Sequence, residues 1–286
     1  MSNQSPPFRA IVTDIDGTIV DSRKQLTAFT RHELRRVTSG YGIHLILAST
    51  RMPASLRHIQ GELGIAGPIV AYNGALAIHP SDTSVGYSSP LDDSVALSLV
   101  NHLLSQQVHV GVFSLDRWFV TSVDYWALRE IRGTCVWPHG TPLKTAIEAG
   151  AIFPVHKIMI RGEAGTLSRA VERVMTSFDN ISVGRDRETI VEFTGNSTSK
   201  AIALKQVLDW LGISASSVIA FGDGVSDIGM LKLAGMGIAV YNASEAVRSA
   251  SDEVTLSSDE DGVGYALRKY FPVVGHDSWP LPSASD

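Results

Sequence analysis

Two aspartates, Asp14 and Asp16, stand at the end of an apolar run near the start of the chain. The apolar residues around them predict a buried strand that ends at Gly17. Side chains two positions apart on a strand point the same way, so both carboxylates are expected to converge beyond the strand. Two carboxylates so close repel each other unless a cation or a proton lies between them. Carboxylate oxygens are ligands that suit Mg²⁺, and a carboxylate held by a metal can also attack phosphorus. The alternative is a solvated strand-to-loop turn.

A second acidic stretch, with Asp223 and Asp227, follows the apolar run at residues 218–221. In a doubly wound sheet, ligands bind at the carboxyl ends of the strands. Asp223 is therefore expected to face Asp14 and Asp16, while Asp227, in the first turn of the next helix, would hold a metal-bound water. Taken alone, this stretch is also compatible with a Gly/Asp turn that caps a helix.

Three further groups are candidates for binding an anion. Ser49, Thr50 and Arg51 follow a predicted strand and precede a predicted helix, where a hydroxyl and free backbone N–H groups bind anions. Lys200 opens another predicted helix and would neutralise a phosphate together with a nucleophilic carboxylate. The Asn73 amide, beside Gly74, would donate to the same anion. The structural alternatives are a simple helix cap, a solvent-facing lysine and a turn-forming Asn-Gly pair.

Strand and helix signals alternate in the two outer parts of the chain, which predicts a parallel sheet with right-handed crossovers. The first part gives strands at 10–15, 44–48 and 68–71 with helices at 27–39 and 53–63. The last part gives helices at 199–211, 229–234 and 245–250 with strands at 218–221 and 238–240. The middle mixes helices and short strands. We therefore predict an α/β Rossmann-like core from residues 1–82 and 188–286, with an inserted α+β cap at 83–187.

Composition excludes several classes of function. The 286 residues are 44% hydrophobic and 19% charged, with a net charge of −5, which predicts a globular protein that binds neither nucleic acid nor an anionic membrane. No apolar run approaches the ~20 residues of a membrane span. The single cysteine, Cys135, is expected to be a buried thiol, and its isolation favours a reducing compartment. A cytoplasmic enzyme is the expectation. Four aromatic residues of the middle region are expected in the cap core: Trp118, Tyr125, Trp126 and Trp137.

Taken in order, the residues resemble the four motifs of the haloacid dehalogenase superfamily. These are Asp14-Ile15-Asp16-Gly17-Thr18, the Ser49 hydroxyl, Lys200, and Gly222-Asp223 followed by Asp227. The insertion between the second and third motifs looks like a type IIB cap, and the match is closest to the Cof-like sugar-phosphate phosphatases. In-order agreement of several motifs is far more specific than any one of them.

The resemblance implies a Mg²⁺-dependent phosphomonoesterase. Asp14 would attack phosphorus to form an aspartyl-phosphate, and Asp16 would protonate the leaving alcohol and then activate water. Mg²⁺ would be held by the Asp14 carboxylate, the Asp16 main-chain carbonyl and Asp223, with Asp227 acting through water. The phosphoryl oxygens would be bound by Ser49 and Lys200.

Three positions depart from the family pattern. Thr50 replaces a glycine beside the phosphate, and Tyr241 replaces a small residue. Ser226, a candidate substrate-binding residue, stands where the fourth motif usually has an asparagine. None of these changes removes a group that would touch metal or phosphate.

Sugar phosphates are the leading substrate class, with pyridoxal phosphate or flavin mononucleotide behind. Two alternatives remain open at this point: a phosphomutase of the same superfamily and a non-catalytic regulator that binds a phosphorylated ligand. A homodimer is left open as the assembly.

Overall fold

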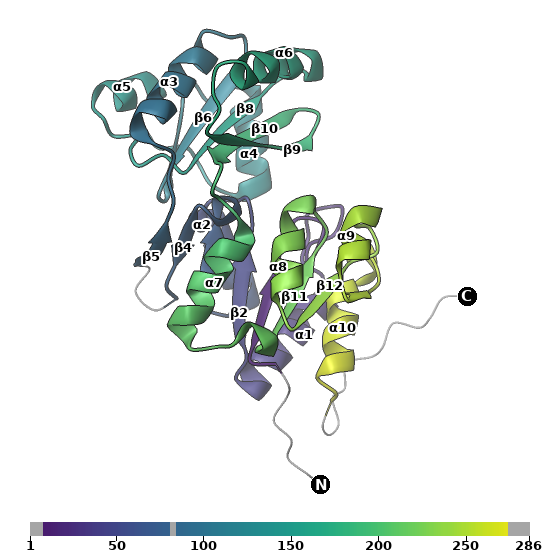
Figure 1. Cartoon of the computed structure of the whole chain (residues 1–286). Helices are drawn as coiled ribbons and strands as arrows, with labels where there is room; N and C mark the ends of the chain where they lie inside the picture. Colours follow the sequence, from purple (N-terminus) through teal and green to yellow (C-terminus); the bar gives the residue numbers. More distant parts are fainter. Residues whose placement is uncertain (1–7, 81–83, 274–286) are drawn as a thin grey trace.

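The computed structural model describes residues 8–80 and 84–273, which form two sheets stacked one above the other (Figure 1). The larger, eight-stranded sheet has the order β13-β12-β11-β1-β2-β3-β4-β5 and is parallel from β13 to β3. Its strands are β1 (Ala10–Thr13), β2 (His44–Ala48), β3 (Ile69–Ala71), β4 (Leu76–Ile78), β5 (Val85–Ser88), β11 (Val218–Gly222), β12 (Met236–Ala239) and β13 (Glu253–Val254).

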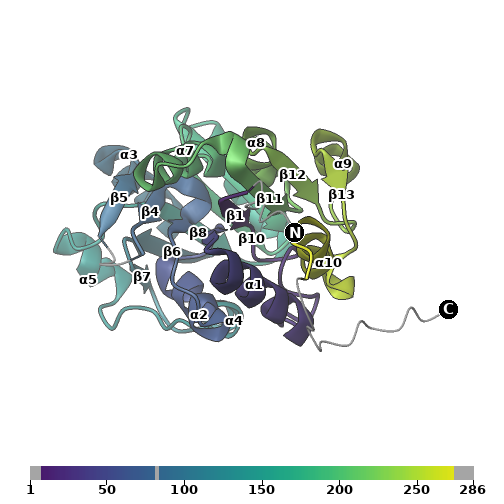
Figure 2. The same ribbon diagram turned by 90° about the horizontal axis from the view of Figure 1, so that it is seen from below.

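Helices cover both faces of this sheet because its central strands are apolar on both sides. Ile11 belongs to one buried cluster, while Ala10 and Val12 belong to the other. Figure 2 shows the helices of each face on opposite sides of the strands. One face carries α1 (Ala28–Tyr41), α2 (Pro53–Leu63) and α10 (Gly262–Tyr270), and the other carries α7 (Lys200–Leu211), α8 (Ile228–Leu233) and α9 (Glu245–Ala250). The predicted α/β fold with a doubly wound parallel sheet is confirmed.

The second sheet is antiparallel, with the order β7-β6-β8-β10-β9. Its strands are β6 (His109–Ser114), β7 (Arg117–Val120), β8 (Lys157–Arg161), β9 (Ile181–Arg187) and β10 (Ile190–Gly195). Its helices are α3 (Asp93–Leu104), α4 (Tyr125–Thr134), α5 (Leu143–Glu148) and α6 (Ala164–Met175). Ile158 and Ile160 enter a cluster of their own with α3 and α6, whereas Met159 points to the other face.

Two strands belong to a different sheet from the one predicted from their positions in the sequence. β5 lies inside the predicted cap range 83–187 but pairs with β4 of the large sheet. β10 lies after residue 187 but pairs with β8 and β9 of the small sheet. We propose that the cap runs from about residue 89 to residue 195, because strand pairing rather than composition defines the boundary.

Several expectations about the middle region were wrong. Cys135 is exposed, at the end of α4. Tyr125 and Trp137 are also exposed, at 63% and 67%, whereas Trp118 is buried as expected. Within the described residues, no helix is both long and apolar enough to cross a membrane.

Candidate active site

Strand order brings the predicted motifs to one edge of the large sheet. β1 lies between β11 and β2, with Thr13 opposite Phe221 on one side and Leu47 on the other. The chain therefore leaves β1, β2 and β11 at neighbouring points, and their crossovers run in opposite directions from β1. That reversal is the topological switch point at which open α/β sheets bind ligands. Asp14, Ser49 and Asp223 follow these three strand ends.

Three carboxylates gather at this switch point. Oxygen atoms of Asp14, Asp223 and Asp227 all lie within 4.8 Å of one another. Gly17 permits the approach, because a Cβ there would stand 2.5 Å from Asp223 Oδ2. Burial raises the pKa of Asp14 well above its usual value, and repulsion from Asp227 and Asp223 adds to the rise although Lys200 opposes it. A compact set of hard oxygen donors with excess negative charge fits Mg²⁺.

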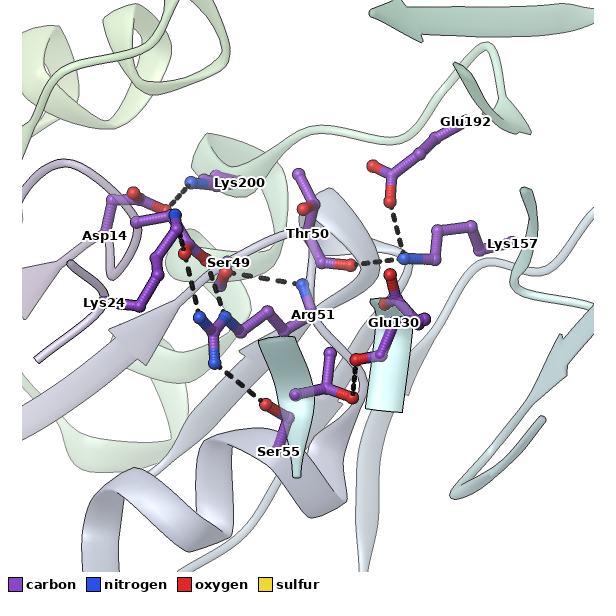
Figure 3. A network of polar contacts seen from close by, with 12 residues as sticks. Asp14, Lys24, Ser49, Thr50, Arg51, Ser55, Glu130, Lys157, Glu192 and Lys200 are labelled. Carbon is purple, nitrogen blue, oxygen red and sulfur yellow. Dashed lines mark hydrogen bonds and ion pairs between the residues drawn. The ribbon is translucent and has the colours of Figure 1, made fainter. Parts of the chain in front are cut away.

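Lys200 is buried among these carboxylates. Its Nζ donates to Asp14 Oδ1 and to Asp227 Oδ1, both at 2.6 Å, and its side chain is 1% exposed (Figure 3 shows the Asp14 contact). Burial lowers the pKa of Lys200, but the two carboxylates more than offset this and hold it above its usual value. Lys200 is therefore a fixed ammonium.

Gly74 lies against the start of α7, which carries Lys200. A Cβ on Gly74 would stand 2.2 Å from Ser199 O, and its φ is +98°. The predicted turn glycine thus lets the loop after β3 reach Ser199, whose side chain caps α7. The structure gives Gly74 a packing role at the edge of the site.

Asp227 shapes the loop that carries Asp223. Its Oδ2 accepts from the backbone N–H groups of Asp223 and Gly224, at 3.1 and 2.9 Å. The sequence predicted that Asp227 lies in the first turn of the next helix and holds a metal-bound water, which stays a prediction. In the structure, its side chain also ties the loop after β11 to Lys200.

Asp16 does not join the three-carboxylate cluster, although it was predicted to converge with Asp14. Its carboxylate faces Arg51, which donates to it from Nε at 2.6 Å and Nη2 at 2.8 Å, and Lys24 Nζ also contacts it. Burial alone would raise the pKa of Asp16, but the hydrogen bonds and charges of Arg51 and Lys24 hold it well below its usual value. Asp16 is thus ionised in this arrangement, and the Arg51 fork predicted for phosphate is occupied by it.

The other predicted anion-binding residues surround the same edge. Ser49 is buried, and its Oγ accepts from Arg51 N at 3.3 Å. Asn73 has a positive φ of 57°, and its buried Oδ1 lacks a hydrogen-bond partner among the described residues. Thr50 points its carbonyl toward the cap, and Ser226 is exposed beside Gly224.

Several residues of this network were not predicted from the sequence. Thr18 donates from Oγ1 to Asp223 Oδ1 at 2.9 Å, and no spacing rule singled it out within its motif. Lys24 lies in a loop with φ 64°, and only its contact with Asp16 identifies it. The position of Lys157 could have been predicted. Lys157 and Arg161 are the two ends of β8, and because side chains alternate along a strand, both point to the same face.

The cap is docked on the large sheet around this site. Tyr72, after β3, donates from its hydroxyl to Leu115 O at 2.7 Å. Asp116 accepts from Ala54 N at 2.7 Å and contacts Arg57, so the β6–β7 turn covers the start of α2. These contacts join the cap to the large sheet at the β6–β7 turn.

Comparison with known proteins identifies the family. A family model described as haloacid dehalogenase-like hydrolase matches residues 11–267. A putative phosphatase of Haemophilus influenzae is 27% identical over 268 residues, covering 93% of this chain and 99% of that protein. The 5-amino-6-(5-phospho-D-ribitylamino)uracil phosphatase YitU of Bacillus subtilis is 28% identical, covering 91% and 97%. The crystal structure of a haloacid dehalogenase-like hydrolase from Bacteroides thetaiotaomicron superposes with a TM-score of 0.84 at 30% identity, covering 92% and 100%.

Proposed function

The chain belongs to the family of haloacid dehalogenase-like hydrolases, and on that premise we propose that this phosphatase is a Mg²⁺-dependent phosphomonoesterase for a small phosphorylated metabolite. A sugar phosphate is the leading substrate class. The observation that carries the proposal is the buried cluster in which Lys200 bridges Asp14 and Asp227 beside Asp223. A dianionic phosphate can approach these carboxylates only when fixed positive charge offsets theirs.

Asp14 is the proposed nucleophile. One of its carboxylate oxygens attacks phosphorus and the bond to the leaving alcohol breaks, which gives an aspartyl-phosphate. Asp14, Asp223 and Asp227 would hold Mg²⁺, which supplies charge neutralisation for the transferring group. Lys200 keeps the Asp14 oxygen in place and offsets negative charge on the phosphoryl group.

Asp16 is the proposed acid and base. In the first half-reaction it gives a proton to the leaving oxygen, and in the second its carboxylate takes a proton from the attacking water. The ionised form paired with Arg51 suits the second step. The first step requires Asp16 to leave Arg51 and turn toward the leaving group with a proton.

A sugar or sugar-alcohol ester is supported by the similarity to the Bacillus subtilis relative, whose name gives a substrate with a phospho-D-ribityl group. Two other classes were considered from the sequence, a phosphomutase and a non-catalytic binder. The presence of both Asp14 and Asp16 favours an enzyme, since a pure binder uses neither a nucleophile nor an acid.

The test is phosphate release from para-nitrophenyl phosphate and a panel of sugar and cofactor phosphates, with and without Mg²⁺. Metal-dependent turnover that Asp14→Asn abolishes, and that the exposed-site control Asp179→Asn retains, supports the proposal. Absence of turnover on every compound, with folded protein and Mg²⁺ present, would refute it. Phosphate that moves to another position on the substrate without being released would identify a mutase.

A further inference from the structure

The loop between β1 and α1 carries a lysine in an unusual backbone conformation. Lys24 has φ 64°, in the left-handed region that residues with a Cβ rarely adopt. A glycine would take this conformation without steric cost, so a lysine is held there against its backbone preference. Such positions persist where the surrounding structure fixes them, and they gather at functional sites. The side chain of Lys24 is therefore a candidate for a task that glycine cannot perform.

The structure that fixes this turn is centred on Asp21, which is buried. Asp21 Oδ1 accepts from Gln25 N at 2.8 Å and from Arg23 N at 2.9 Å. Lys24 N donates to Asp21 O at 2.9 Å, inside the same turn. These bonds hold the backbone on both sides of Lys24, so the loop sets the direction of its side chain.

The turn directs the side chain of Lys24 toward the carboxylate of Asp16. Lys24 Nζ contacts Asp16 Oδ1, the oxygen that also accepts from Arg51 Nη2 at 2.8 Å. Lys24 and Arg51 come from two different loops, and Figure 3 shows both close to Asp14. The Lys24 side chain is 33% exposed and that of Arg51 is 11% exposed, so Lys24 is the less confined of the two.

We propose that Lys24 is a positioning residue that returns Asp16 to its place for the second half-reaction. In that step, water attacks the phosphorus of the aspartyl-phosphate, and the bond between phosphorus and the Asp14 oxygen breaks. The products are inorganic phosphate and the Asp14 carboxylate, and one proton of the water passes to the Asp16 carboxylate. The inference rests on the proposed phosphatase function and deepens it, because it assigns a role to a residue outside the four motifs.

The two cations that contact Asp16 are suited to different tasks. The Arg51 fork is rigid and also donates to Ser55 Oγ at 3.1 Å, so it binds the carboxylate in one position. Lysine is a compact charge on a flexible stem with three donors, so it can follow a carboxylate that moves. Asp16 must leave Arg51 to reach the leaving oxygen in the first half-reaction. Lys24 can stay with it during this movement and draw it back to Arg51 once the alcohol has left.

The experiment separates the two half-reactions in the Mg²⁺-loaded full chain with para-nitrophenyl phosphate. Its phenolate leaves without a proton, so formation of the aspartyl-phosphate does not need Asp16 as an acid. For Lys24→Met, we expect kcat to fall about tenfold and KM to fall with it, so that kcat/KM changes little. Rapid mixing should show a burst of about one para-nitrophenolate per enzyme, because hydrolysis of the intermediate becomes limiting. Lys24→Arg, which keeps the charge, should restore most of kcat.

A second substitution varies the stability of the loop independently. Lys24→Gly removes the same ammonium but suits the left-handed turn, so its urea midpoint should exceed that of Lys24→Met. The two variants should nevertheless lose the same fraction of kcat, since the effect follows the ammonium. Cys135→Gly, at another left-handed position that is exposed at the end of α4, is the matched control. It should raise the urea midpoint and leave kcat and KM unchanged.

An unchanged kcat in Lys24→Met would overturn the inference. A loss of kcat that follows the urea midpoints of the Met and Gly variants would also overturn it, because Lys24 would then act only through the stability of the loop. A fall in kcat/KM without a burst would do the same, because Lys24 would then act in phosphoryl transfer or bind the phosphate itself. All three outcomes leave the phosphatase proposal standing. Failure of the wild type to hydrolyse any compound would remove both proposals together.

Discussion

Two buried lysines, one in each sheet, have opposite electrostatic settings. Lys200 lies at the catalytic edge between two carboxylates, with Asp223 close by, so its surroundings keep excess negative charge. Lys157 lies in the cap sheet with the Glu192 carboxylate and the neutral Thr50 carbonyl, so its surroundings are balanced. The first arrangement is incomplete without a cation, and the second needs no added charge. The comparison shows that a buried lysine can either leave a site short of positive charge or complete a balanced ion pair, according to the number of carboxylates around it.

The largest effect is expected from Asp14→Asn, which replaces one carboxylate oxygen of the proposed nucleophile with an amide nitrogen. We expect kcat on para-nitrophenyl phosphate to fall by about 10³-fold or more, because the residues of a catalytic set act as a unit. Because Asp14 also accepts a hydrogen bond from Lys200, urea denaturation should confirm that the variant is folded. A variant that keeps a tenth of the activity would show that Asp14 only supports the site.

The next largest effect separates the two lysines directly. Without Mg²⁺, Lys200→Met should lower the free energy of unfolding by about 3–5 kcal/mol, because it leaves buried carboxylates uncompensated. Added Mg²⁺ should recover part of this loss, since a cation can replace the ammonium in charge. Lys157→Met, the matched variant, should cost about 1–3 kcal/mol, because it leaves a buried acceptor unsatisfied, and Mg²⁺ should not restore it. Urea midpoints measured with and without Mg²⁺ test both, and an equal Mg²⁺ response in the two variants would contradict the contrast.

The same contrast explains what the sequence could predict. The catalytic edge was predictable because Asp14, Ser49 and Asp223 directly follow apolar runs, and strand ends meet wherever parallel strands are neighbours. The positions of Lys157 and Glu192 depend on the pairing of β8 with β10, two strands separated by an entire helix. Pairing register is a tertiary property, so local patterns identified the strand at β8 but not the partner of its lysine.

Side-chain direction is the second feature that the sequence did not predict. Spacing placed Asp14 and Asp16 on one side of a strand, but β1 ends at Thr13, before either of them. Alternation therefore stops applying, and Asp16 turns to Arg51 instead. The proposed cap boundaries differ from the predicted ones for a similar reason, because composition does not change where β5 pairs in the large sheet and β10 in the small one.

His156, at the base of the cap, gives a pH-dependent test of how strongly this region depends on uncharged groups. Its Nδ1 accepts from Leu115 N at 3.2 Å and its Nε2 lies 3.0 Å from Ser88 Oγ, which together favour the neutral ring. Burial lowers the pKa of His156 to about 4. The unfolded chain binds this proton more readily between about pH 4 and 6.5, so its contribution to stability is complete above that window and is lost as pH falls through it.

The expected size of this effect is about 3 kcal/mol across the window. His156→Asn keeps an acceptor for Leu115 but cannot be protonated, so its unfolding free energy should vary less with pH than that of wild type. Urea denaturation at pH 4.5, 5.5 and 7 measures the difference, and parallel profiles for the two proteins would disprove the assignment.

The smallest effect tests whether cap stability can be changed without touching the chemistry. Gly133 in α4 and Gly150 after α5 both have open space where a Cβ would lie, but Gly150 has φ +65°. Gly133→Ala should raise the free energy of unfolding by about 0.5–1 kcal/mol through helix propensity. Gly150→Ala should lower it by about 1 kcal/mol, because alanine resists the left-handed conformation. Turnover of para-nitrophenyl phosphate should be unchanged in both. Changes of the same sign in the unfolding free energies of the two variants would contradict the prediction. A loss of turnover that follows cap stability would mean that the cap and the catalytic edge are not independent.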